Sequence, residues 1–226
     1  MILTIDIGNT NIVLGCIDGD KTLFVERLST VRTKTELEYA IDIKSVLDIY
    51  HIHRDEIEGG IISSVVPALV STLKKAIYTV CKVNAIVVGP GIKTGLSIKI
   101  DDPAQLGADL VVGAVAAKEK YPQPTIIFDL GTATTGSVLD KDGNFLGGTI
   151  TTGVKTSINA LTAGAALLPQ IDITAPKKII GTNSIESMQS GCVIGTACMI
   201  DGLIDKFEQE LGEKATIVVT GEKFAA

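Results

Sequence analysis

The strongest constraint on the fold is a pattern that the chain contains twice. Each copy has a short apolar strand, an Asp-x-Gly turn followed by amide or hydroxyl residues, a second apolar strand and an Asp-Gly turn. The first copy spans residues 2–19 and the second residues 125–143. An Asp-Gly pair between apolar runs is typical of a β-hairpin, and each copy continues into a third apolar run. The repeat therefore predicts two similar α/β halves that each open with a three-stranded meander.

The later segments of the two halves also resemble each other. A helical pattern at about 67–82 precedes the apolar strand 85–88, and a longer one at about 185–211 precedes the strand 215–219. A further helix over about 103–120 is expected to join the halves. The sequence Tyr121-Pro122-Gln123-Pro124 breaks any helix at that point. We therefore expect two duplicated domains, 1–120 and 121–226.

The two Asp-x-Gly turns predict a phosphate-binding site. Gly8 and Gly131 let backbone N–H groups approach an anion closely, and Asp6 and Asp129 stand at strand ends where they can hold a cation, directly or through water. One such turn is usually only a turn, but two equivalent copies favour a nucleotide gripped from both sides. The side chains that can donate hydrogen bonds there are Asn9, Thr10, Thr132, Thr134 and Thr135. The sequence has neither a Walker A loop nor a Gly-x-Gly-x-x-Gly fingerprint after a strand.

Three other segments keep both a structural and a functional reading. Asp109 opens an apolar helical run, so it is either a capping or first-turn acid or a functional carboxylate. The segment 90–95 is a glycine-rich loop that serves as a turn or lines a site. The segment 181–188 is typical of a helix start, with Asn183 or Ser184 as the cap.

Composition narrows the class of protein. The net charge is −6, and lysine and arginine form no patch, so no nucleic-acid partner is expected. The longest apolar runs are too short or too interrupted to span a bilayer, and the chain begins directly with a strand. The four cysteines have no Cys-x-x-Cys spacing, and the two histidines lie in one polar segment. We expect a cytoplasmic protein with no zinc site and no membrane partner.

Taken together, these segments resemble the type III pantothenate kinases of the actin-like, sugar-kinase-like ATPase superfamily. The matching motifs are Asp6-Ile7-Gly8-Asn9-Thr10 with Gly15, Ser63-Ser64-Val65-Val66-Pro67, Pro90-Gly91-Ile92-Lys93-Thr94-Gly95, Gly107-Ala108-Asp109, Asp129-Leu130-Gly131-Thr132-Ala133-Thr134-Thr135, and Asn183-Ser184 with Met188-Gln189-Ser190-Gly191. The resemblance implies two ribonuclease H-like domains around a nucleotide cleft, a homodimer, and transfer of the ATP γ-phosphoryl group to pantothenate. The product is 4'-phosphopantothenate, in the first step of coenzyme A biosynthesis. The resemblance also implies Mg²⁺ with ATP and a monovalent cation, K⁺ or NH₄⁺.

The resemblance further implies roles for particular residues. Asp109 is the general base, Asp129 binds the monovalent cation, and Asp6 meets the divalent cation that comes with ATP. The residues implied to bind ATP are Asp6, Ile7, Gly8, Asn9, Thr10, Asn11, Ile12, Val13 and Thr132. Those implied to face pantothenate are Ile100, Gly107, Ala108, Asp109, Leu110 and Ser184.

The chain departs from the family pattern at three positions. Leu110 stands where an arginine is usual, Ile100 where an aromatic is usual, and Glu222 where a second glycine is usual. Relatives are also expected to continue for another helical segment beyond the final residue of this chain. Two alternatives stay open: a kinase of the same superfamily for another small alcohol or carboxylate, and a non-catalytic nucleotide-binding paralogue.

Overall fold

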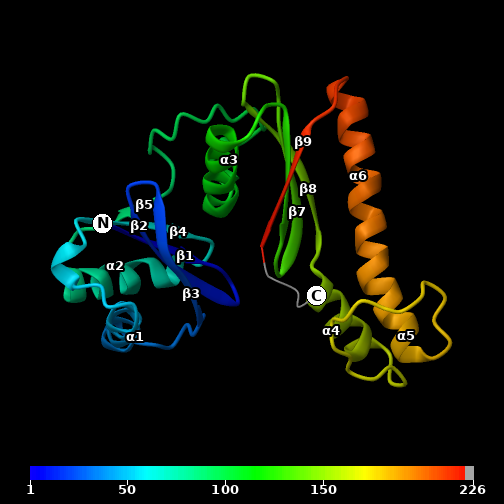
Figure 1. The fold of residues 1–226 in the computed structure, drawn as a ribbon, viewed down its shortest axis with the longest axis horizontal. Helices are drawn as coiled ribbons and strands as arrows, with labels where there is room; N and C mark the ends of the chain where they lie inside the picture. Colours follow the sequence, from blue (N-terminus) through cyan, green and yellow to red (C-terminus); the bar gives the residue numbers. More distant parts are fainter. Residues whose placement is uncertain (222–226) are drawn as a thin grey trace. The chain divides into compact units, whose positions relative to one another are not determined.

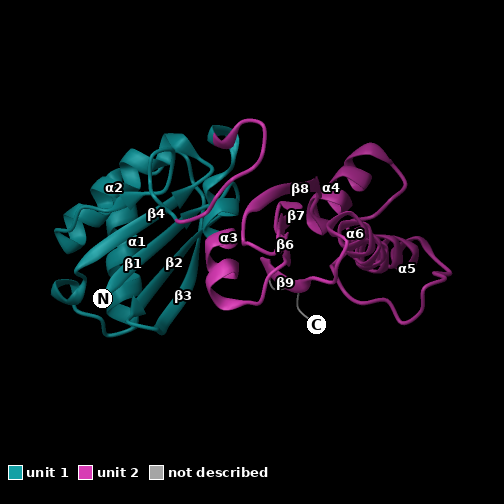
Figure 2. Ribbon diagram, turned by 90° about the horizontal axis from the view of Figure 1, so that it is seen from above, with its two compact units in different colours: residues 1–94, 104–112 teal, residues 95–103, 113–226 magenta. Residues whose placement is uncertain are grey.

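The structure, a computed structural model, describes residues 1–221 and divides the chain into two compact units. Unit 1 comprises residues 1–94 and 104–112, and unit 2 comprises residues 95–103 and the chain from 113 onward (Figure 2). Near the boundary the chain therefore passes into unit 2 at residues 95–103 and returns to unit 1 at residues 104–112. The boundary of the duplication, expected at 120/121, stays a prediction.

Unit 1 is built on a five-stranded sheet. Its strands are β1 (Ile2–Ile7), β2 (Asn11–Asp18), β3 (Lys21–Ser29), β4 (Gly59–Ser64) and β5 (Ile86–Val87), in the order β3-β2-β1-β4-β5. The first three strands form the predicted antiparallel meander, and β4 pairs with β1 in parallel. The Asp-Gly turn between β2 and β3 contains Gly19 at φ +56°, a left-handed conformation that glycine adopts without strain.

Two helices cover one face of this sheet: α1 (Glu36–Ile49) and α2 (Pro67–Cys81). The predicted helix at 67–82 is confirmed, with Pro67 in its first turn, where the missing N–H costs nothing. Helix α1, which begins with a capping box between Thr35 and Glu38, was not predicted. A 3-10 turn, Arg54–Glu56, follows α1.

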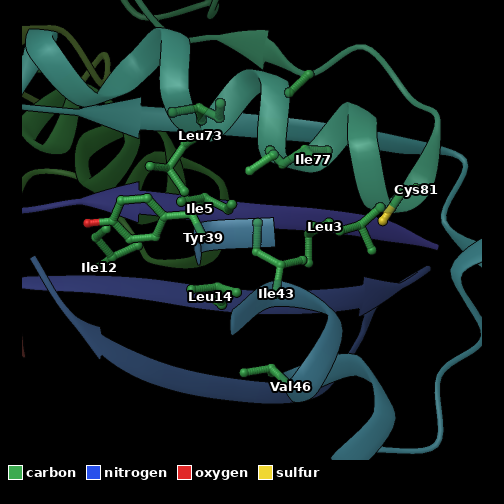
Figure 3. Packing of buried hydrophobic residues seen from close by; sticks show 14 of the residues in the cluster. Leu3, Ile5, Ile12, Leu14, Tyr39, Ile43, Val46, Leu73, Ile77 and Cys81 are labelled. Atoms are coloured by element: carbon green, nitrogen blue, oxygen red, sulfur yellow. The ribbon is translucent and has the colours of Figure 1, made fainter. Parts of the chain in front are cut away.

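The hydrophobic core of unit 1 covers one face of the sheet and leaves the other face to polar side chains. Alternate residues of β1, including Leu3 and Ile5, are buried and pack with Ile43 of α1 and Ile77 of α2 (Figure 3). Because successive side chains of a strand point to opposite faces, Asp6 lies on the face away from this core. The sheet thus separates an aliphatic core from a polar site.

Tyr39 combines core packing with a fixed loop. Its side chain is fully buried, and its hydroxyl donates to the Val31 carbonyl at 2.9 Å and accepts from the Val31 N–H at 3.1 Å. We expect Tyr39→Phe to lower the free energy of unfolding by about 1–2 kcal/mol, because both Val31 groups lose their partner. Urea denaturation measures this, with Tyr78→Phe on the exposed side of α2 as the control. Equal stabilities of the two variants would contradict the expectation.

Unit 2 repeats the same sheet topology. Its strands are β6 (Thr125–Leu130), β7 (Ala133–Leu139), β8 (Phe145–Thr152) and β9 (Thr216–Gly221), in the order β8-β7-β6-β9. The meander β6-β7-β8 is antiparallel, and β9 pairs with β6 in parallel, as β4 does with β1. The duplication predicted from the two Asp-x-Gly copies is therefore confirmed for these four strands. The predicted match of the strand 215–219 with the strand 85–88 is wrong, because β9 takes the place of β4 beside the first strand and not that of β5.

The helices of the second half differ more from the predictions. The expected helix 103–120 is a 3-10 turn, Pro103–Gln105, followed by α3 (Ala108–Lys120), and α4 (Val154–Gly164) was not predicted. The expected helix 185–211 comprises α5 (Ser184–Gln189), a π-helical turn (Ser190–Ile194) and α6 (Gly195–Leu211).

Helix α6 runs alongside the strands of unit 2 (Figure 1). Its residues Leu203 and Phe207 pack against the core around Phe128. The helical stretch Ser184–Leu211 is long and apolar enough to cross a membrane by length and composition alone, a test that core helices of soluble proteins also pass. The packing onto Phe128 gives its apolar residues a role within unit 2.

Candidate active site

The first Asp-x-Gly turn, Gly8–Thr10, is held by hydrogen bonds from within and from the end of β3. The Gly8 N–H donates to the Asn11 carbonyl at 2.9 Å. Thr30 donates its N–H to the Thr10 carbonyl at 2.9 Å and its hydroxyl to the Gly8 carbonyl at 2.7 Å. A Cβ at residue 8 would lie 2.9 Å from the Asn11 carbonyl oxygen, so the turn requires glycine here.

The second turn, at Gly131 and Thr132, is built in the same way. The Gly131 N–H donates to the Ala133 carbonyl at 3.0 Å, and Gly153, just after β8, donates to the Thr132 carbonyl at 3.1 Å. The Thr156 hydroxyl donates to the same carbonyl at 2.7 Å. A Cβ at Gly153 would lie only 2.0 Å from the Gly131 carbonyl oxygen, which excludes a side chain there. The duplication thus extends to the hydrogen bonds that hold each Asp-x-Gly turn.

Sequence reasoning missed the residues that brace these turns. Thr30 and Arg32 follow the third strand of the first copy, and the Arg32 guanidinium donates to the Asn9 side-chain oxygen at 3.3 Å. Gly153 and Thr156 occupy the matching place in the second copy. Superposing the two sequence copies beyond their third strands would have pointed to all four, because each segment returns to the turn of its own copy.

Unit 1 brings two carboxylates together on the free face of its sheet. Asp6, near the end of β1, stands in register with Val13 on β2 and Ser63 on β4, and Asp109 in the first turn of α3 is close enough to act on it electrostatically. Burial raises the pKa of Asp6 above its usual value, the Ser63 hydroxyl lowers it, and the charge of Asp109 raises it again. Such a pair can divide two tasks, with one carboxylate facing a metal and the other accepting a proton.

Asp109 lies in the first turn of α3, with its carboxylate held by a local hydrogen bond. Helix α3 begins at Ala108, and Gly107 accepts from the Val111 N–H at 3.1 Å, so Asp109 lies inside the first turn and does not precede it. One Asp109 oxygen accepts the Leu110 N–H at 2.8 Å. A Cβ at Gly107 would lie 2.4 Å from that oxygen, so this glycine is what leaves room for the carboxylate.

Asp129 in unit 2 lies between two strands that carry threonines. Asp129 on β6 stands in register with Thr135 on β7 and Thr220 on β9. The Thr135 hydroxyl, on the same face as Asp129, is buried and has no hydrogen-bond partner within residues 1–221. The same holds for the hydroxyl of Thr134, but successive side chains of a strand alternate, so Thr134 faces the other side of the sheet. Carboxylate and hydroxyl oxygens are ligands that hard cations prefer. Across the described residues, no group of three or more His, Cys, Asp or Glu side chains is placed to hold a metal.

Ser184 begins α5, and the cap of that helix is Asn183, whose side chain accepts the Glu186 N–H at 2.9 Å. Ser184 lines a cavity of about 1100 Å³ in unit 2, together with glycines and with hydroxyl and apolar side chains from β8, α4, α5 and α6. Thr152 and Ser157 are among these, and their hydroxyls lie 2.8 Å apart. The cavity can take a polar, partly apolar molecule.

The other residues that the resemblance implied to face pantothenate do not line this cavity. Ile100 belongs to the segment that runs along β8, where the Lys99 N–H donates to the Phe145 carbonyl at 2.8 Å. Ile100 lies near Gly147 and is not among the described residues that line the Ser184 cavity. Leu110 and Ala108 belong to unit 1, beside Asp109. The structure therefore groups Gly107–Leu110 with Asp6, and places Ser184, Ile100, Asp129 and Thr132 in unit 2.

Two meander halves, each with a fourth strand parallel to the first and an Asp-x-Gly turn after that first strand, define the actin-like class of kinases and ATPases. A protein from Sinorhizobium meliloti named as a candidate 2-dehydro-3-deoxygalactonokinase shares this fold. It aligns with a TM-score of 0.53 and 12% identity, over 98% of this chain and 91% of its own.

Sequence comparison gives the family within that class. The family model for type III pantothenate kinase matches residues 2–206. A type III pantothenate kinase of Exiguobacterium sp. strain AT1b is 45% identical over 98% of this chain and 87% of its own length. One from Halalkalibacterium halodurans is 42% identical over the same shares. The chain belongs to the type III pantothenate kinase family.

Proposed function

We propose that this chain transfers the γ-phosphoryl group of ATP to the primary hydroxyl of pantothenate. The reaction gives 4'-phosphopantothenate, the first intermediate on the route to coenzyme A. The observation that carries the proposal is the pairing of Asp6 and Asp109 in unit 1, next to the braced turn Gly8–Thr10. Membership of the family supports pantothenate as the acceptor.

The residues 6–13 and Thr132 are proposed to hold the ATP phosphates. The glycine turns offer backbone N–H groups at short range, and Asn9 and Thr10 add side-chain donors. The Arg32 guanidinium, hydrogen-bonded to Asn9, brings positive charge to the same turn. Mg²⁺ that arrives with ATP neutralises phosphate charge, and Mg²⁺ is usually held by one or two carboxylates plus the phosphates. Asp6 is the carboxylate that we propose for this role.

Asp109 is proposed to accept the proton of the pantothenate hydroxyl. A carboxylate is too weak a base to ionise an alcohol beforehand, but the hydroxyl becomes acidic as its bond to phosphorus forms. Asp109 therefore needs only to be placed next to the hydroxyl, with Gly107 leaving space beside it. In phosphoryl transfer such positioning and charge stabilisation do most of the work.

The rest of the pantothenate molecule is assigned to Ile100, Gly107, Ala108, Leu110 and Ser184. Leu110 cannot pair with a carboxylate as an arginine would. The loss of such a pair costs about 1.5–3 kcal/mol unless another donor replaces it.

A monovalent cation is proposed at Asp129, with the buried hydroxyl of Thr135, in register with Asp129 on β7, as a further oxygen ligand. Activity should require K⁺ or NH₄⁺ and fall when Na⁺ replaces them. Thr135→Val keeps the shape of the side chain without the oxygen and should raise the K⁺ concentration needed for half-maximal rate by about tenfold. Initial rates at fixed ionic strength measure both effects. Equal rates in the three salts, together with an unchanged K⁺ requirement of the variant, would contradict this assignment.

The setting of the enzyme completes the proposal. We expect a cytoplasmic homodimer without nucleic-acid or membrane partners, built of ribonuclease H-like domains 1–120 and 121–226. A coupled assay of ADP release, run with pantothenate and with a panel of small alcohols and carboxylates, tests the function. Turnover with pantothenate supports it, turnover only with another acceptor supports a different kinase of the superfamily, and no turnover supports a non-catalytic paralogue.

A further inference from the structure

Arg32 lies in the segment that follows β3, and the chain is fixed on both sides of it. Before it, Thr30 donates its N–H and its hydroxyl to the first Asp-x-Gly turn, at 2.9 and 2.7 Å. Next to it, the N–H and the carbonyl of Val31 both bond the hydroxyl of the buried Tyr39. After it, the Lys34 N–H donates to the Val31 carbonyl at 3.1 Å. Arg32 thus extends from a segment whose backbone is held to the turn and to the core.

The two cations of this segment have different surroundings. Lys34 pairs with Asp42 at 2.6 Å, and its ammonium lies 5.5 Å from the centre of the Tyr39 ring. Arg32 is exposed and forms no ion pair within the described chain. Its guanidinium makes one hydrogen bond there, to the Asn9 side-chain oxygen at 3.3 Å. A guanidinium carries five N–H donors, so most of them remain available to an anion at this turn.

The negative charges of the site favour a cation at this place. Unit 1 carries two carboxylates, Asp6 and Asp109, that are close enough to act on each other. The triphosphate of ATP adds further negative charge, and like charges at close range repel. Mg²⁺ offsets part of this repulsion. An arginine offsets a further part and can bind two phosphate oxygens with parallel N–H groups.

We propose that Arg32 is a catalytic residue that binds the γ-phosphoryl group of ATP. The inference rests on the function proposed above and adds a residue to the same site. Asp6, which is proposed to face Mg²⁺, comes two residues before Gly8. In kinases the metal bridges the β- and γ-phosphates. A guanidinium bonded to Asn9 therefore faces that end of the nucleotide and not the adenosine.

The transfer step gives Arg32 a role beyond binding. The bond between the γ-phosphorus and the ADP oxygen breaks, a bond to the acceptor oxygen forms, and the acceptor proton passes to Asp109. Arg32 gives up no proton and only donates hydrogen bonds to the phosphoryl oxygens, over which charge is spread in the transition state. Donors fixed in advance toward that charge lower the barrier. Arg32 should therefore affect kcat as well as nucleotide affinity.

A structural alternative is that Arg32 only orients Asn9. Asn9→Ala separates the two roles, because it removes the oxygen that Arg32 contacts and leaves the guanidinium in the chain. If Arg32 acts only through Asn9, Arg32→Gln should have no further effect in the Asn9→Ala background. If Arg32 binds the phosphoryl group itself, Arg32→Gln should weaken binding in both backgrounds.

Arg54 supplies a matched control. It is an exposed arginine of unit 1 that lies 3.8 Å from Asp55. Its 3-10 turn lies beside the start of β1, where the Met1 ammonium donates to the Glu56 carbonyl at 2.9 Å. The Gly8–Thr10 turn follows the other end of that strand. Arg54→Gln thus removes the same charge from the same unit, away from the turn.

Calorimetric titration with the Mg²⁺ complexes of ADP and of the non-hydrolysable analogue β,γ-imido-ATP tests the proposal. We expect Arg32→Gln to weaken binding of the analogue about tenfold or more and binding of ADP less than about threefold, because only the analogue carries a γ-phosphate. Arg32→Lys keeps the charge and should lose less affinity for the analogue than Arg32→Gln. Arg54→Gln should bind both nucleotides as the wild type does. In steady-state assays Arg32→Gln should lower kcat by about 10²-fold.

Four results would overturn the proposal: equal losses for ADP and the analogue, no loss for either, equal losses in Arg32→Lys and Arg32→Gln, or disappearance of the effect in the Asn9→Ala background. Melting curves control for misfolding, and Arg32→Met takes the place of Arg32→Gln if the latter does not fold. Because the titrations need no acceptor, they stay decisive if pantothenate is not the substrate, which would overturn the proposed function alone. A wild-type chain that binds neither nucleotide would overturn both.

Discussion

Asp109→Asn should lower kcat for pantothenate phosphorylation by roughly 10²–10⁴-fold, the usual worth of a positioned general base. Asparagine has the size of aspartate but cannot take up a proton. Its side-chain oxygen can still accept the Leu110 N–H, the 2.8 Å bond that Asp109 makes in the first turn of α3. The substitution therefore separates catalysis from helix stabilisation at a single atom.

The alternative for Asp109 gives a different result. If the carboxylate serves only the first turn of α3, Asp109→Asn should be nearly silent in rate, since asparagine supports a helix start about as well. Melting curves and ATP titration control for misfolding and for loss of the nucleotide site. A folded, ATP-binding variant that loses less than about threefold in kcat would leave Asp109 with a structural role.

Asp6→Asn should lower turnover by roughly 10²-fold or more, because it removes the negative charge that faces the metal and phosphates. The expected site of the loss is the nucleotide side, so KM for Mg·ATP should rise together with the fall in kcat. Turnover at saturating Mg²⁺ measures the effect. A variant that works at the wild-type rate under these conditions would remove Asp6 from the mechanism.

Asp6→Asn lowers turnover, but it should not lower the thermal stability of the protein at neutral pH. Burial raises the pKa of Asp6 above its ordinary value of 3.8. The native state then holds its proton more tightly than the unfolded state, so stability falls as pH rises from that value through the folded-state pKa. The asparagine side chain introduced by Asp6→Asn carries no charge, so the variant should melt no lower than the wild type at neutral pH. Any gain should vanish when Asp6 of the wild type is protonated.

How far the sequence predicts the fold depends on the range of the interactions. The two meanders were predictable because Asp-Gly turns and alternating apolar residues are local signals, and they recur in both copies. Helix α1 was missed although Thr35 and Glu38 form its capping box, since short polar signals of this kind are common. The break before Ala108 was missed because helical periodicity alone does not show that the 3-10 turn ends at Gln105 and that α3 begins separately at Ala108.

The candidate site shows the same contrast between local signals, which can be read from the sequence, and tertiary contacts, which cannot. The turns at Gly8 and Gly131 were identified from sequence because their residue types carry the chemistry. Thr30 and Arg32 were not, because they reach the first turn through tertiary hydrogen bonds. Ser63 was part of a recognised motif, but only the strand register places its hydroxyl beside Asp6. Residue type predicts the chemistry that a side chain can carry out. The pairing of strands that are distant in sequence determines which groups that side chain contacts.

Identifying the product tests most directly whether this chain phosphorylates the primary hydroxyl of pantothenate. The chain is incubated with ATP, Mg²⁺, K⁺ and pantothenate, and the mixture is analysed by ³¹P NMR and mass spectrometry. We expect a phosphate monoester of pantothenate, formed in equal amount to ADP and lost in Asp109→Asn. ADP without phosphorylated pantothenate, or no reaction in a chain that binds ATP, would contradict the claim.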